Sequence, residues 1–208
     1  WNKDFIFKNK FQPSFILIRG ISDFHNSEIY RSRTIRNKED LSDINTYSYP
    51  PIEYNTLGRT NLKTKQVLYS SNCPTTSLLE YLNTGNANEI VYLSVWKFKK
   101  RKGIQTFRIN EFEENLGYTK WKLGQNANDK SLELVKEIFE YLIKLYKSKN
   151  YNFSAPLSHF LLYTHNICNM IKYPSIVTDS QSYNYDINTD FFKQEFELSR
   201  VYKVRILG

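Results

Sequence analysis

The stretch from Glu89 to Lys99, EIVYLSVWKFK, limits the possible folds of this chain more than any other segment. If it is extended, its alternate residues form two faces, and both are largely apolar. The first face carries Ile90, Tyr92, Ser94, Trp96 and Phe98, and the second carries Val91, Leu93 and Val95. A strand that is apolar on both faces is typical of a sheet that is covered on both sides. We therefore predict that residues 89–99 form the central strand and that residues 103–109 pair with it.

The clearest helix begins near Lys130. Apolar residues recur there at helical spacing, while Lys136, Glu140, Lys144 and Lys147 take the opposite face. The apolar positions are Leu132, Val135, Ile138, Phe139, Leu142 and Tyr146. This pattern predicts an amphipathic helix whose apolar stripe packs on the core.

The other segments complete a prediction of α+β class. Their expected bounds are strands at 28–33 and 66–71, a helix at 77–83 after Pro74 and closed by Gly85, a helix from Ser154 or Ala155 to about Met170, strands at 173–178 and 200–207, and a loop at 37–51. This order predicts one domain with mixed and antiparallel sheets flanked by helices. We place the domain at residues 29–208 and treat residues 1–28 as an N-terminal extension packed on it.

The composition is that of a globular chain. Hydrophobic residues make up 40% of the 208 positions and aromatic residues 16%, which excludes an intrinsically disordered chain. No apolar stretch approaches the roughly 18 residues of a membrane span, and residues 1–10 lack a secretory signal. We therefore expect a cytoplasmic protein that does not enter a membrane. Because the only methionine is Met170, Trp1 is not expected to be the translational start.

The sequence contains no metal-binding or common nucleotide-binding motif. Cys73 and Cys168 form no CxxC pair, and the three histidines lack the HExxH spacing. The fingerprints of the phosphate-binding loop, the dinucleotide-binding fold and the hydrolase nucleophile elbow are also absent. We expect no metal and no bound cofactor.

The charge is the next constraint. Lys and Arg number 29 against 21 Asp and Glu, so the net charge of +8 favours a polyanionic partner or an anionic substrate. The strongest basic run is KFKKRK at residues 97–102. It could contact nucleic acid, but we interpret it as the solvated end of a hairpin.

Four short motifs stand out as candidates for chemistry. Taken separately, each has an ordinary explanation, such as a surface arginine or a solvated helix carboxylate. The motifs are Tyr30-Arg31, Gly58-Arg59-Thr60-Asn61, Leu68-Tyr69-Ser70 and, on the predicted short helix, Glu80. Taken together, this succession resembles the RES domain, a bacterial toxin domain named for its Arg, Glu and Ser.

The resemblance extends downstream and covers residues 28–207. Residues 151–154, YNFS, resemble the family's Tyr-x-x-Ser/Thr at a helix start, and residues 172–176, KYPSI, resemble the end of its following strand. The chain departs from the family where Leu57 and Thr60 replace a Gly and a Trp, and where Pro156-Leu157 replaces a polar pair.

The resemblance implies a fold similar to that of ADP-ribosyltransferases and an enzyme that consumes NAD as a substrate. The expected activity is cleavage of the nicotinamide–ribose bond by a toxin-like glycohydrolase or phosphorylase. Such an enzyme arrests growth unless it is neutralised. The usual partner in the family is a helix-turn-helix antitoxin of Xre type.

The residue types suit this substrate. Arg31 and Arg59 could bind the diphosphate through fork-shaped, charge-assisted hydrogen bonds. Glu80 could stabilise the oxocarbenium character that develops on the ribose. Tyr69 could stack on nicotinamide or ribose, and Ser154 could offer a hydroxyl and backbone N–H groups at a helix start.

The predicted catalytic residues are therefore Glu80, Arg31, Tyr69 and Ser154. The predicted NAD-binding residues are Arg31, Arg59, Asn61, Tyr69, Ser154 and Ser175.

Two alternatives remain open at the level of sequence. The acceptor could be a protein side chain, which would make the chain an ADP-ribosyltransferase. From another class of function, the chain could be a basic nucleic-acid-binding module without catalysis, using residues 97–102 and nearby aromatic residues. We do not expect direct binding of nucleic acid.

Overall fold

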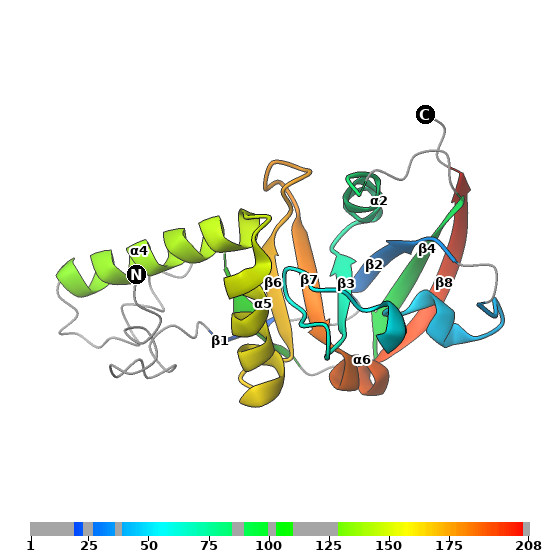
Figure 1. Ribbon diagram of the computed structural model, residues 1–208, viewed down its shortest axis with the longest axis horizontal. Coiled ribbons are helices and arrows are strands. Elements are labelled where there is room, and N and C mark those ends of the chain that lie inside the picture. The colour runs from blue at the N-terminus through cyan, green and yellow to red at the C-terminus, as the bar shows by residue number, and fades with distance from the viewer. Residues whose placement is uncertain are drawn as a thin grey trace.

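The computed structural model describes residues 19–22, 27–35, 39–84, 90–99, 103–109 and 129–205. Eight strands form one mixed sheet in the order β1-β5-β6-β7-β3-β2-β4-β8 (Figure 1). The strands are β1 Arg19–Ser22, β2 Glu28–Arg33, β3 Val67–Ser71, β4 Ile90–Phe98, β5 Ile104–Arg108, β6 Met170–Pro174, β7 Tyr183–Asn188 and β8 Phe196–Arg205. Only the β5–β6 pair is parallel among these strands. The predicted α+β class is confirmed.

Helices cover the sheet. They are α2 Pro74–Leu82, α4 Asp129–Lys147, α5 Tyr151–His159 and α6 Thr189–Glu195, with short 3₁₀ helices at Ile44–Tyr47 and Ile52–Tyr54. A π-helical turn, Phe160–Thr164, continues α5. Within the described residues, no helix has both the length and the apolarity needed to cross a bilayer.

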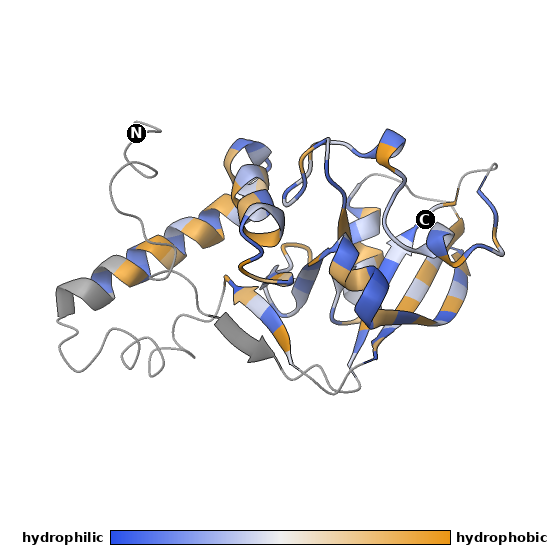
Figure 2. Cartoon of the chain, turned by 90° about the horizontal axis from the view of Figure 1, so that it is seen from below, coloured by the Kyte–Doolittle hydropathy of each residue, from blue (hydrophilic) through white to orange (hydrophobic). Residues whose placement is uncertain are grey.

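The amphipathic helix predicted from Lys130 is confirmed as α4. Phe139, Leu142 and Tyr146 are buried in a core that also contains Phe107 and Ile171 of the sheet. Bands of hydrophobic and hydrophilic residues alternate along this helix (Figure 2). This banding is expected when apolar residues recur every three or four positions and so form a stripe on one side. The sheet residues of this core come from β3, β5 and β6.

The predicted place of residues 89–99 is wrong, although the strand itself is confirmed. β4 lies between β2 and β8, one strand from the edge, and β5 pairs with β1 and β6 at the far end of the sheet. β4 is apolar on both faces because both are covered: Trp96 packs edge-on against Phe192 of α6, with ring centres 4.7 Å apart, and α2 packs on the other face. A strand that is apolar on both faces is therefore covered on both faces, but it does not have to lie at the centre of the sheet.

Several boundaries in the C-terminal half also differ from the prediction. The helix expected from Ser154 to Met170 begins at Tyr151, where Asn150 Oδ1 accepts a hydrogen bond from the backbone N–H of Asn152. It ends before Asn166, whose φ of 47° is left-handed. Met170 instead begins β6, and the strand expected at 173–178 ends at Pro174.

The elements that were not predicted include the strand β7 and the short helix α6. Part of the predicted N-terminal extension, β1, pairs with β5 as an edge strand of the sheet. The closing role expected of Gly85 lies outside the described residues.

The sheet is nearly divided between β2 and β3. These strands pair only at Tyr30 and Ser71, whereas β3 and β7 pair along five residues. Beyond that single pair, the Arg31 guanidinium fills the gap: Nη1 donates to the carbonyl oxygen of Tyr69 at 2.8 Å and Nε donates to that of Ser48 at 2.7 Å. Arg31 therefore joins the two parts of the sheet where their backbones no longer pair.

We expect Arg31→Ala to destabilise the protein because it leaves the carbonyls of Ser48 and Tyr69 without their donor. The loss of hydrogen bonds to a charged group should cost about 1.5–3 kcal/mol of unfolding free energy, measured by urea denaturation. Arg31→Lys should recover only part of it, because a single ammonium lacks the guanidinium fork. Arg200→Ala, which removes a half-exposed arginine from the edge strand, is the control. An Arg31→Ala protein as stable as Arg200→Ala would contradict this role.

Candidate active site

Polar side chains gather on one face of β3, β6 and β7. Residues opposite each other in antiparallel strands project to the same face. Tyr69 lies opposite Asp186, and Asn184 lies opposite both Ser71 and Tyr173. These five side chains therefore share one face, beside the gap that Arg31 fills.

Helix α2 brings Glu80 to this face. The helix begins at Pro74, and the Cys73 sulfur accepts a hydrogen bond from the backbone N–H of Thr76. Glu80 is half-buried, and its Oε1 accepts hydrogen bonds from Ser175 Oγ at 2.7 Å and from Asn184 Nδ2 at 2.6 Å. Oε2 makes no hydrogen bond among the described residues, so one carboxylate oxygen is held and the other is available.

The Gly58-Arg59-Thr60-Asn61 motif forms a turn built around the hydroxyl of Tyr69. This hydroxyl accepts a hydrogen bond from the backbone N–H of Thr60 and donates one to Asn61 Oδ1. Asn61 Nδ2 donates to Asn55 Oδ1 and to the carbonyl oxygen of Thr56. The polar atoms of Asn61 and the Tyr69 hydroxyl therefore hold the turn in place. Sequence analysis had predicted that these two residues bind NAD.

Gly58 is required by the tightness of this turn. A Cβ at this position would overlap with Asn61 Oδ1 and with the Tyr69 hydroxyl. The glycine of the motif therefore has a steric explanation that needs no ligand.

The turn directs Arg59 toward Tyr173. The guanidinium carbon lies 5.4 Å from the centre of the Tyr173 ring, a cation–π distance. The Nε atom is buried and has no hydrogen-bond partner within the described residues. Burial alone would lower the pKa of Arg59, but Tyr173, Asp186 and Tyr151 raise it overall. Arg59 is therefore a fixed positive charge against the Tyr173 ring.

Asp186 is the fully buried carboxyl of the site, and the sequence analysis did not find it. Its Oδ2 accepts a hydrogen bond from Thr60 Oγ1 at 2.7 Å, and its Oδ1 has no partner among the described residues. Burial raises the pKa of Asp186 to about 7, against the opposing effects of Thr60, Tyr173 and Arg59. Its charge therefore changes near neutral pH.

Arg31 borders the same site from the gap in the sheet. Burial, and next the neighbouring charge of Arg33, lower the pKa of Arg31 to about 10. Nε and Nη1 donate to backbone carbonyls, so two donors of the fork that the sequence analysis assigned to a diphosphate are already engaged. Nη2 makes no hydrogen bond with the described residues.

The two predicted serines differ in their positions. Ser175 is fully buried and donates to Glu80, so it belongs to the site. Ser154 is the fourth residue of α5, so the YNFS motif lies at the start of this helix, but the helix begins three residues before Ser154. Its Oγ is fully buried and unpartnered among the described residues.

Asp186 and Asn184 were not predicted as site residues because their strand, β7, was not predicted. The segment YNYDIN alternates Tyr183, Tyr185 and Ile187 with Asn184, Asp186 and Asn188, which is a period-two strand pattern. That alternation was the available signal.

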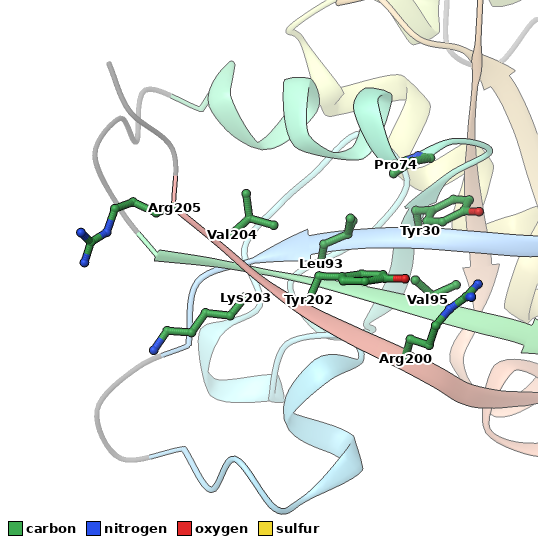
Figure 3. Close-up of a pocket in the computed structure, with 9 residues that line it drawn as sticks. All are labelled: Tyr30, Pro74, Leu93, Val95, Arg200, Tyr202, Lys203, Val204 and Arg205. Atoms are coloured by element: carbon green, nitrogen blue, oxygen red, sulfur yellow. The ribbon is translucent and has the colours of Figure 1, made fainter.

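A separate hollow of about 650 Å³ lies over β2, β4 and β8 (Figure 3). Its lining includes Tyr30 and Pro74 together with Arg200 and Tyr202 of the edge strand. It does not include Glu80, Arg59 or Asp186, so it is distinct from the candidate site.

A scan against protein-family models and a search of curated proteins found no match to this chain. Among the described residues, no three His, Cys, Asp or Glu side chains are grouped as metal ligands. What defines the candidate site is a held carboxylate, a buried acid and two arginines on the face of an α+β sheet.

Gly58→Ala should destabilise the protein, because the added methyl group displaces Asn61 or Tyr69 from the turn. Overpacking of this kind typically costs about 1–3 kcal/mol. Leu57→Ala, at an exposed neighbouring position, is the control and should change stability by less than about 0.5 kcal/mol. Thermal melts of the two variants decide the matter; equal melting temperatures would mean that the turn has room to relax.

Asp186 should make stability depend on pH. Its pKa is raised in the folded protein, so its contribution to stability is full below about pH 4 and is lost as the pH rises to about 7. Asp186→Asn has no such titration, so its stability should rise relative to the parent protein between pH 5 and pH 8. Each unit of pKa shift corresponds to about 1.4 kcal/mol.

The measurement is urea denaturation of both proteins at several pH values, with Asp190→Asn as a control at an exposed carboxyl. A stability difference between Asp186→Asn and parent that stays constant across this range would contradict the raised pKa.

Proposed function

We propose that this protein cleaves the nicotinamide–ribose bond of NAD, in a site and fold related to those of the ADP-ribosyltransferases. The observation that carries the proposal is the Glu80 carboxylate, which is held through Oε1 and free at Oε2, on a face that also contains Arg59 and Tyr173. Arg31, which occupies the gap between β2 and β3 beside this face, adds a second positive charge that suits a diphosphate.

The chemistry assigns a role to each group. The bond between ribose C1′ and the nicotinamide nitrogen breaks, and its electron pair leaves with nicotinamide. The ribose gains positive charge, which Glu80 Oε2 stabilises at short range. An acceptor oxygen then bonds to C1′ and loses its proton. Electrostatic stabilisation of this kind acts only as the charge develops, so it raises kcat more than it lowers KM.

Arg59 is the first candidate for the diphosphate. Its guanidinium is fixed on Tyr173, and its Nε has no partner among the described residues. Arg31 is held beside the site by the carbonyls of Ser48 and Tyr69, and it can add Nη2 to a phosphate. Tyr69 contributes its ring as a wall, since its hydroxyl holds the Thr60–Asn61 turn.

The proposal includes the partners that the RES resemblance implies. The chain would act in the cytoplasm, without a metal or bound cofactor, as a growth-arresting toxin neutralised by a helix-turn-helix antitoxin. Water or phosphate is the proposed acceptor. Transfer to a protein side chain would use the same Glu80 geometry and differs only in the acceptor.

The purified protein should release nicotinamide from NAD. Chromatography that resolves nicotinamide, ADP-ribose and ADP-ribose 1″-phosphate measures the reaction and identifies the acceptor. Glu80→Gln should lower kcat by about 10²–10³-fold with little change in KM, because the amide keeps the shape but not the charge.

Glu140→Gln, on the exposed face of α4, is the matched control and should keep full activity. Intact NAD after hours with folded parent protein would overturn the proposed function. A kcat of Glu80→Gln within threefold of the parent would remove Glu80 from the mechanism.

A further inference from the structure

We infer that Asn184 is a positioning residue that fixes the Glu80 carboxylate for catalysis. The inference rests on the proposed function and adds to it a residue from β7, a strand that the sequence analysis did not find. Asn184 does not need to touch the substrate, because it acts through Glu80.

The contacts of Asn184 form a directed chain. Ser71 Oγ donates to Asn184 Oδ1 at 2.7 Å, and Asn184 Nδ2 donates to Glu80 Oε1 at 2.6 Å. A carboxylate only accepts hydrogen bonds, so the amide nitrogen must face Glu80. The Ser71 hydroxyl then fixes the amide from its other side, so the direction of both hydrogen bonds is determined.

The surroundings make Asn184 a rigid support. It is 4% exposed and lies between Ser71 of β3 and Tyr173 of β6 in the sheet register. Its backbone is paired on both sides, so the side chain starts from a fixed point. Ser175 Oγ donates to the same Oε1 atom from the loop after β6. Two donors on one oxygen restrict the rotation of Glu80 and leave Oε2 for the reacting carbon.

Positioning matters because a glutamate side chain on a short helix would otherwise sample several rotamers. Only the rotamers that place a carboxylate oxygen against the ribose stabilise the transition state. Groups that hold a catalytic side chain in one rotamer raise the fraction of productive complexes, and this effect falls on kcat.

The simpler interpretation is that Asn184 only links α2 to β7 and stabilises the fold. It predicts that removal of the amide lowers the melting temperature and leaves kcat of the folded protein unchanged. The two interpretations therefore differ in a kcat measured well below the melting temperature.

The first test is Asn184→Ala, assayed for nicotinamide release from NAD. We expect kcat to fall by about tenfold or more, the equivalent of one lost hydrogen bond to a charged group, while KM stays within threefold. Thermal melts of the same samples show that the assayed protein is folded.

The second test needs no change at Asn184 itself and uses two adjacent serines as a matched pair. Ser71 and Ser70 are both buried on β3, and each donates one hydrogen bond to β7. Ser71 donates to Asn184 Oδ1, and Ser70 donates to the carbonyl oxygen of Tyr185. Ser71→Ala and Ser70→Ala should lose similar stability. Only Ser71→Ala should lower kcat, by about three- to tenfold.

The third test is the pH profile of Asn184→Asp. Two carboxyl groups at hydrogen-bond distance do not both ionise readily, and the protonated member can donate to the other. The activity of Asn184→Asp relative to the parent should therefore rise as the pH falls from 8 to 5. The new carboxyl lies on the same face of β7 as Asp186 and shifts its titration as well, so this profile is interpreted beside the kcat of Ser71→Ala, which adds no charge.

The outcomes separate the two proposals. A parent protein that leaves NAD intact overturns the proposed function, and the positioning role falls with it. An active parent with Asn184→Ala and Ser71→Ala both within threefold of its kcat overturns the positioning role alone. If Asn184→Ala does not fold, the Ser71 and Ser70 pair decides: equal kcat values in the two overturn the inference, and a loss confined to Ser71→Ala supports it.

Discussion

The Arg31 guanidinium and the carbonyl of Tyr69 form the contact on which the rest of the site depends. The two parts of the sheet share one backbone pair, so their relative position relies on side chains. Tyr69 transmits this position further, since its hydroxyl holds the turn that carries Arg59. Tyr69, which was predicted to contact the ligand, therefore has a structural role: it connects the two parts of the sheet to the turn that carries Arg59.

The site concentrates polar groups that a core would avoid. Asp186 and Arg59 each keep a buried atom without a partner among the described residues, and burial of such atoms opposes folding. The apolar packing beneath α4 and α5 and around Trp96 offsets this cost elsewhere. Other unpartnered buried atoms lie outside the site, for example on Ser154 and His159 of α5. The site is therefore distinguished by the combination of such atoms with the held Glu80 carboxylate.

Local patterns predicted the local features well. The strands β2 and β3 and the apolar stripe of α4 follow from periodicity, because each needs only neighbours along the chain. The structure places Ser175 beside Glu80, and both residues belong to the motifs. Ser175 was predicted to bind NAD, whereas in the structure its hydroxyl donates to Glu80. The predicted partner of β4 was wrong because period and hydrophobicity carry no information about strand order.

The sequence by itself determined the α+β class, the strands β2 to β5, the amphipathic helix and the residue types available for chemistry. Only the tertiary structure decided which of them meet. The hydrogen bond between Thr60 and Asp186 joins residues 126 positions apart, and that between Asn184 and Glu80 spans 104 positions. No local propensity encodes such contacts. They arise when strands far apart in sequence pair in one register, which places their alternate side chains on a shared face.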